Sequence, residues 1–175
     1  MRLAASVLGV GLLLSLFGAA RSARAFEREW HLGAAAGVSN GQGLKLSPAV
    51  GAYAAYGLSD VFDLRLELTA RGYHVGSEQN PNALSGMLGL TYKVDVLRWV
   101  PWAGVYAGYL AFLDVPPPTL AFKQRDVALG IGAGLDYGIS RKLGVGVTLR
   151  FDDALTHSDA SSFDALLRAE YRWGW

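Results

Sequence analysis

Apolar and polar residues alternate one by one over several long stretches of this chain. Between Asp63 and Gly72 every even position is apolar or glycine, whereas the odd positions carry four charged residues and a threonine. Successive side chains of a strand point to opposite faces, so a period of two predicts a strand with one apolar and one polar face. A helix would scatter the same residues around its circumference. The pattern recurs in Lys142–Asp152 and in Phe163–Trp175.

Weaker alternation of the same kind predicts four further strands, and the uncharged segment Trp99–Leu113 completes the set. The eight predicted strands cover Trp30–Val38, Ala49–Leu58, Asp63–Gly72, Leu84–Asp95, Trp99–Leu113, Val127–Tyr137, Lys142–Asp152 and Phe163–Trp175. In Trp99–Leu113 both faces are apolar, so the pattern does not assign its two sides.

The segments between these strands alternate strictly between long and short. Ser39–Ser47, His74–Ala83, Asp114–Gln124 and Ala154–Ser162 are long and polar or rich in Gly and Pro, whereas Ser59–Val61, Val96–Arg98 and Ser140–Arg141 are short turns. Eight strands in a meander, with long loops on one rim and tight turns on the other, predict an all-β fold, an eight-stranded antiparallel up-and-down transmembrane β-barrel. Closure of the sheet removes edges that lipid could not satisfy.

Glycines indicate which face of this barrel points inward. They concentrate on the polar face, and a narrow barrel has room inside for small residues and a few long ones. The continuous apolar face then points outward, where water cannot be its solvent. The outward aromatics should form two girdles, Trp30, Tyr56, Tyr92, Tyr137, Tyr171 and Trp173 near the short turns and Phe112, Phe151 and Phe163 near the long loops. A soluble, lipocalin-like ligand-binding barrel with inverted faces is the alternative.

Residues 1–25 have the features of a secretory signal peptide. A basic start precedes an uncharged apolar run, and small residues stand at Ala23 and Ala25. We expect cleavage after Ala25, which leaves residues 26–175 as a single barrel domain. Of the 16 Lys and Arg residues, three leave with this segment, so 13 basic residues face 15 acidic ones. Dispersed basic residues at this balance argue against nucleic-acid binding, and the absence of cysteine means that disulfides do not stabilise the exported protein.

The final strand alternates charges and rings, with Tyr171, Trp173 and Trp175 on one face. This pattern resembles the C-terminal assembly signal of outer-membrane barrels, in which a terminal Phe is commoner than Trp. Architecture and signal together make the mature chain similar to the small OmpA/OmpX-like eight-stranded outer-membrane β-barrels. The resemblance implies a monomer in the outer membrane of a Gram-negative cell, in contact with its lipids and with the β-barrel assembly machinery. The long loops would then be the place where an extracellular partner binds.

The polar face predicts a network of charges inside the barrel. The candidate residues are Arg65, Glu67, Arg71, Lys93, Asp136, Arg150, Asp152, Arg168, Glu170 and Arg172. Gly144 and Gly146 are expected opposite Glu170 and Arg168, and Glu67 is expected to pair with Arg65 or Arg71. Buried charges must be paired, and eight strands leave no open channel. We therefore expect a structural network that fills the lumen.

Other reactive residue types do not form a convincing site. His31, His74 and His157 lack the spacing of metal ligands, and no cofactor is expected. His157-Ser158-Asp159 has the residue types of a hydrolase, and some eight-stranded barrels are lipid A deacylases. Those enzymes place a His-x-Ser arrangement on a lipid-facing strand, whereas this segment falls in a loop. We expect a structural or surface-interaction role and no enzyme activity, with a deacylase-like lipid-modifying enzyme as the alternative. The proline-stiffened Asp114–Phe122 is a rigid connector or a docking surface.

Overall fold

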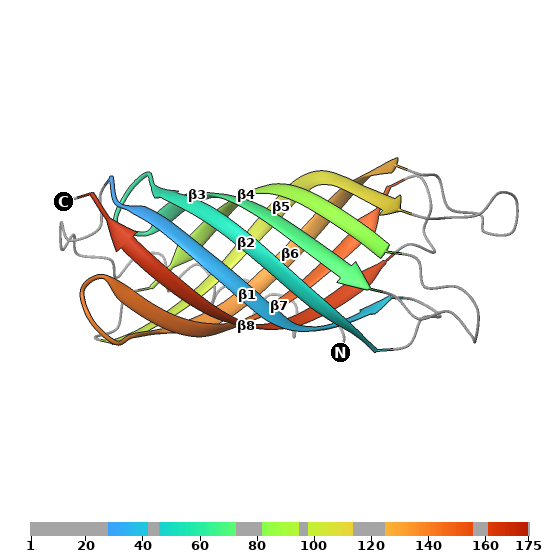
Figure 1. Cartoon of the computed structure of the whole chain (residues 1–175). Coiled ribbons are helices and arrows are strands. Elements are labelled where there is room, and N and C mark those ends of the chain that lie inside the picture. Colours follow the sequence, from blue (N-terminus) through green and yellow to red (C-terminus); the bar gives the residue numbers. More distant parts are fainter. Residues whose placement is uncertain are drawn as a thin grey trace, which may run out of the picture.

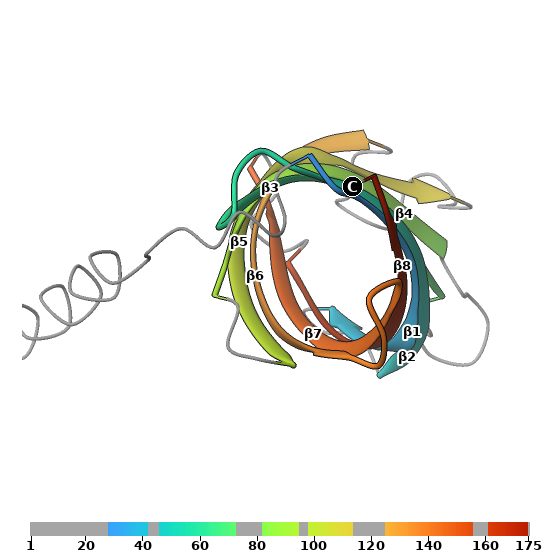
Figure 2. The same cartoon turned by 90° about the vertical axis from the view of Figure 1, so that its left-hand side faces the viewer.

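The computed structural model describes residues 28–41, 46–72, 82–94, 98–113, 125–155 and 161–174. Its strands are β1 (Trp30–Gly41), β2 (Ser47–Gly57), β3 (Phe62–Gly72), β4 (Asn82–Lys93), β5 (Trp99–Leu113), β6 (Arg125–Gly138), β7 (Leu143–Ala154) and β8 (Ser162–Trp173). Each strand pairs with the next, and β1 also pairs with β8, so the sheet closes into a barrel. The strands are tilted against the barrel axis (Figure 1), and the view along the axis shows the complete ring (Figure 2). The predicted eight-stranded meander is confirmed.

Several strands continue further toward the long-loop rim than the alternation predicted. β1 extends to Gly41, and Asn40 and Gly41 pair with Phe163 and Ser162 of β8. A strand ladder is made by backbone N–H and C=O groups, so it continues through polar residues that break the hydrophobic pattern. Within the described residues, no helix has the length and apolar character of a membrane-spanning segment.

The inner and outer faces of the barrel differ sharply in polarity. On β3, Leu66 is 49% exposed and its neighbour Glu67 is 8% exposed. The other strands repeat this alternation, which leaves an outer surface of Leu, Val, Ile and Ala. Because the closed ladder pairs the strand edges, such a barrel can place this surface in hydrocarbon without unpaired backbone groups.

Aromatic side chains pack in pairs around the outside of the short-turn rim. The paired rings are Trp30 with Tyr56, Phe62 with Tyr92, Trp99 with Tyr137, and Tyr171 with Trp173, with ring centroids 4.8 to 5.9 Å apart. Phe151 and Phe163 also point outward, toward the long-loop rim. The outward placement of Phe112 was wrong, because this ring is only 6% exposed. Phe112 lies opposite Ala83 of β4, and residues directly opposite in a ladder share a face, here the inner one.

The structure also assigns the two faces of β5. Val100, Trp102, Tyr106, Leu110 and Phe112 point inward, whereas Trp99, Val105 and Tyr109 are exposed. The buried residues of this part of the barrel form an apolar cluster of Ala83, Met87, Trp102, Tyr106, Leu110, Phe112, Ala128 and Ala154. One wall of the lumen is therefore apolar, which explains why both faces of this strand are apolar in the sequence.

Large inward rings lie over glycines of the neighbouring strands. In the ladders Tyr53 is opposite Gly33, Tyr106 opposite Gly89 and Trp102 opposite Gly134. A Cβ atom added at any of these glycines would collide with the facing ring. Each large ring thus occupies the space that the facing glycine leaves free, which fills the interior of the narrow barrel.

Candidate functional site in the barrel lumen

Five charged side chains meet in the half of the lumen nearer the long loops. This long-loop cluster consists of Glu67 and Arg71 of β3, Arg150 and Asp152 of β7, and Asp164 of β8. Arg71 donates from Nε to Asp164 Oδ1 at 2.9 Å and from Nη2 to Asp152 Oδ2 at 2.7 Å. Arg150 donates from Nη1 to Glu67 Oε2 at 2.5 Å. All five side chains are buried, so each guanidinium is compensated by carboxylates from other strands.

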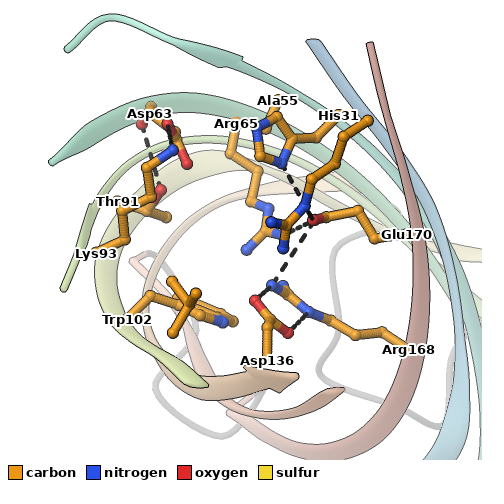
Figure 3. Close-up of a pocket in the computed structure, with 12 residues that line it drawn as sticks. His31, Ala55, Asp63, Arg65, Thr91, Lys93, Trp102, Asp136, Arg168 and Glu170 are labelled. Atoms are coloured by element: carbon orange, nitrogen blue, oxygen red, sulfur yellow. Dashed lines mark hydrogen bonds and ion pairs between the residues drawn. The ribbon is translucent and has the colours of Figure 1, made fainter. Parts of the chain in front are cut away.

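A second group lies in the half nearer the short turns, and Figure 3 shows its members His31, Asp136, Arg168 and Glu170. This short-turn cluster consists of His31 of β1, Tyr53 of β2, Asp136 of β6, and Arg168, Glu170 and Arg172 of β8. Glu170 accepts hydrogen bonds from the Tyr53 hydroxyl at 2.8 Å and from Arg172 Nε at 2.6 Å. His31 Nδ1 lies 3.1 Å from Glu170 Oε1. Arg168 donates to both oxygens of Asp136 in the bidentate geometry that guanidinium and carboxylate favour.

Arg65 connects the two clusters. Its Nε lies 3.3 Å from Glu67 Oε1, and its Nη2 lies 3.9 Å from Glu170 Oε2. The guanidinium also lies over the Tyr53 ring at 4.1 Å and the Trp102 ring at 4.7 Å from the centroids. Ion pairs therefore continue through the barrel from one cluster to the other.

The rings of Tyr53 and Trp102 contact a second guanidinium as well. Arg168 lies 5.1 Å from the Tyr53 centroid and 4.6 Å from the Trp102 centroid. Each ring thus faces two cations, in the geometry of cation–π contacts. This arrangement fills the middle of the lumen with flat groups that pack against one another.

A small cavity lies beside the short-turn cluster. Its volume is about 20 Å³, and its lining includes Asp63, Arg65, Lys93, Trp102 and Glu170 (Figure 3). Lys93 Nζ is 2.8 Å from Asp63 Oδ1, which neutralises this side of the cavity. The volume suits about one water molecule and excludes a sugar or a nucleotide.

The charged groups are arranged for mutual compensation. His31 lies between Glu170 and Glu29, whose Oε2 is 3.6 Å from His31 Nε2. Burial raises the pKa of Glu29, the residue that precedes β1, although nearby His31 and Arg172 oppose this shift. Among the described residues, no group of three His, Cys, Asp or Glu side chains could hold a metal ion. Arginines also interrupt any relay of protons, because a guanidinium does not deprotonate in proteins.

All ten predicted lumenal residues face inward, and none is more than 8% exposed. Nine belong to the connected ion pairs, and Lys93 pairs with Asp63. Gly144 and Gly146 lie opposite Glu170 and Arg168 in the ladder between β7 and β8.

The partners of Glu67 differ in part from the expectation. Arg65 is a partner, but the second is Arg150 of β7 rather than Arg71. Arg71 lies four residues further along β3, which is roughly 13 Å along an extended strand. Arg150 approaches Glu67 from across the lumen, and this proximity depends on strand tilt that the sequence does not reveal.

The sequence prediction missed several members of the site. They are His31, Asp63 and Asp164 among the polar residues, with Tyr53 and Trp102 among the rings. The alternation could have identified His31, Asp63 and Asp164, because each occupies a position on the polar face of its strand. The position of Tyr53 on the glycine-rich face of β2 also indicated that it points inward. The inward position of Trp102 could not be predicted, because both faces of β5 are apolar.

Some predictions concern residues outside the described part of the chain. They are the signal peptide of residues 1–25, His74, the proline-rich segment 114–122, His157-Ser158-Asp159 and the terminal Trp175. These remain predictions.

Comparisons with known proteins identify the architecture. The sequence matches no protein-family model and no curated protein. The barrel is similar to Neisserial surface protein A, with a TM-score of 0.67 and 13% identity over 83% of this chain and 96% of that one. It is also similar to the N-terminal barrel domain of OprF from Pseudomonas aeruginosa, with a TM-score of 0.62 and 16% identity over 84% and 98% of the two chains.

A third similar structure is Ail, the attachment invasion locus protein of Yersinia pestis. Its TM-score is 0.55, with 14% identity over 85% of this chain and all (100%) of Ail. A de novo designed transmembrane β-barrel also matches, with a TM-score of 0.52 and 17% identity over 84% of this chain and 97% of the design. Natural and designed barrels at such low identity share geometry rather than a residue motif. The protein thus has the fold of the small eight-stranded outer-membrane β-barrels.

Proposed function

We propose that the protein is an integral outer-membrane β-barrel with a structural or surface-interaction role. The observation that carries this proposal is the combination of an apolar outer face with a lumen filled by paired charges. Such a molecule is stable only if hydrocarbon surrounds it, because water would meet a barrel-wide apolar surface. The paired rings at the short-turn rim support the same placement, since Trp and Tyr favour the membrane–water interface.

The proposal includes a closed lumen and no enzymatic activity. The connected ion pairs and the stacked Arg65, Tyr53, Trp102 and Arg168 support closure, because they occupy the centre of the narrow barrel. The buried carboxylates of both clusters lie in ion pairs with arginines, which supports a structural role over one as a nucleophile or general base. The surface-interaction role finds support in Ail, which is named an attachment protein and has been solved with the heparin analogue sucrose octasulfate.

The proposed route to the membrane rests on residues 1–25 and on the aromatic residues of the closing strand. Residues 1–25 would direct export and be removed by cleavage after Ala25, and Tyr171, Trp173 and Trp175 would present the closing strand to the assembly machinery. The mature protein would then lie in the outer membrane as a monomer. Fractionation of native cells tests the location, and a change in gel mobility on boiling tests the closed barrel in each fraction. Recovery of the folded protein from the soluble fraction would contradict the proposal.

Electrical recording in planar bilayers tests the closed lumen. We expect the folded wild-type barrel to give no steady conductance at neutral pH. Trp102→Ala removes a ring that contacts both Arg65 and Arg168, so it should open a water-filled path and produce measurable current. Tyr109→Ala is the matched control, because Tyr109 lies on the same strand but is 66% exposed on the outer face. This control should give no steady conductance, like the wild type. A steady open channel in the wild type would refute a closed lumen.

A further inference from the structure

The short-turn rim carries exposed cations that the lumenal network does not use. Arg98 lies directly before β5, and Arg141 and Lys142 lie in the turn between β6 and β7. All three side chains are exposed. No carboxylate among the described residues lies within ion-pair distance of them, in contrast to the paired arginines inside the barrel. Within the described part of the chain, three positive charges without a carboxylate partner therefore face the surroundings of this rim.

Backbone contacts bring the two segments together. Gly138, at the end of β6, donates its N–H to the Arg98 carbonyl at 2.8 Å. On the other side of the turn, Ser140 Oγ accepts the N–H groups of Lys142 at 3.3 Å and Leu143 at 3.1 Å. These bonds order the turn that presents Arg141 and Lys142 beside Arg98. Since the turn directly follows Gly138, the three cations belong to one stretch of the rim, which we call the basic rim patch.

The basic rim patch lies next to the aromatic girdle. Arg98 Nη1 donates to the Tyr137 hydroxyl at 3.4 Å, and the Tyr137 ring packs on Trp99 with centroids 4.8 Å apart. Trp and Tyr mark the depth of the lipid headgroups in a membrane barrel. Because Arg98 contacts this ring pair, its guanidinium lies at the level of the headgroup phosphates. A lipid bound there would contact apolar side chains with its acyl chains, aromatic rings at the interface and positive charges with its headgroup.

We propose that the basic rim patch binds the phosphate group of an anionic phospholipid. The inference rests on the proposed membrane location and adds a ligand class to it. Short turns face the periplasm in outer-membrane barrels, so the ligand belongs to the inner leaflet of that membrane. Charge complementarity supports an anionic lipid over a zwitterionic one, since a choline or ethanolamine group would bring a further cation close to the three cations of the patch. Each cation near an anionic membrane surface contributes about a fivefold gain in affinity.

Spin-labelled lipids in nanodiscs test this proposal. The full mature barrel is placed in phosphatidylcholine nanodiscs, and the association of labelled phosphatidylglycerol is compared with that of labelled phosphatidylcholine. We expect the wild type to favour phosphatidylglycerol at least about fivefold. The variant Arg98→Gln/Arg141→Gln/Lys142→Gln should reduce this preference to less than twofold. The control Arg98→Lys/Arg141→Lys keeps the charge and should keep the preference.

The remaining outcomes separate the possible failures. An equal preference in the wild type and the triple Gln variant would overturn the site, as would a wild type without preference. Loss of the preference when inorganic phosphate replaces chloride at constant ionic strength would assign the patch to free phosphate and also overturn the lipid proposal. Each variant is checked for the mobility change on boiling, so a misfolded barrel is recognised. Failure of the wild type to enter nanodiscs would instead refute the membrane location itself.

Discussion

At the residue scale, the interior of this barrel depends on arginines that contact several strands. Arg71 of β3 reaches Ser85 of β4, Asp152 of β7 and Asp164 of β8. A planar guanidinium has five donors in fixed directions, so it can hold three strands at once, which an ammonium group does less well. Removing one carboxylate would leave the buried guanidinium with only part of its compensating charge, and that is a costly change in such a network.

A residue-scale prediction concerns the depth of the outer face. Leu66 lies in the middle of β3 and is 49% exposed, whereas Leu58 lies in the turn after β2 and is 53% exposed. Leu66→Arg should lower the free energy of unfolding by about 2–4 kcal/mol, because it places a cation near the centre of the hydrocarbon layer. Leu58→Arg is the matched control and should cost about 0–1 kcal/mol near the interface. Urea unfolding in lipid vesicles measures both. Equal small costs would show that water surrounds the barrel.

At the element scale, the strands fit together because glycines and large rings are opposite each other. Gly33 of β1 lies under the Tyr53 ring, so Gly33→Leu must displace that ring and its bond to Glu170. We expect a loss of about 1–3 kcal/mol from overpacking. Ala34→Leu is the control on the same strand, because Ala34 points outward and a larger apolar side chain there meets only lipid. Urea unfolding of the two variants compares the faces, and equal effects would contradict the assigned orientation of β1.

The individual strands differ in how much of their position and facing could be predicted from the sequence. Alternation in β3, β7 and β8 predicted both strand positions and facing, because one face of each is charged. It did not predict the facing of β5, since the inward Trp102 and Tyr106 belong to an apolar wall of the lumen. Phe112 was misplaced for the same reason. The alternation identifies which residues point into the lumen. The partner of Glu67, however, depends on how β7 faces β3 across the lumen, and no local sequence pattern encodes this arrangement.

At the scale of the whole molecule, closure depends on one long ladder between the chain's first and last strands. β1 and β8 pair from Trp30 with Trp173 to Gly41 with Ser162. The two strands of this ladder are far apart in the sequence, so it is the least local pairing in the barrel. An open intermediate would expose two unpaired edges in lipid, where each unsatisfied backbone group costs several kcal/mol. The closing ladder is therefore required for a barrel that is stable in lipid.

A cysteine pair tests this closure directly, because the natural sequence contains no cysteine. Ala34 of β1 and Ala169 of β8 are opposite each other in the ladder and both point outward. Directly opposite residues have Cα atoms about 4.5–5.5 Å apart, within the range of a disulfide. Ala34→Cys/Ala169→Cys should therefore cross-link on oxidation, and the oxidised barrel should resist the mobility change on boiling until a reductant is added. The control Ala34→Cys/Ala165→Cys is out of register by four residues, roughly 13 Å, and should not cross-link. Cross-linking of the control pair instead would show that β8 closes on β1 in another register.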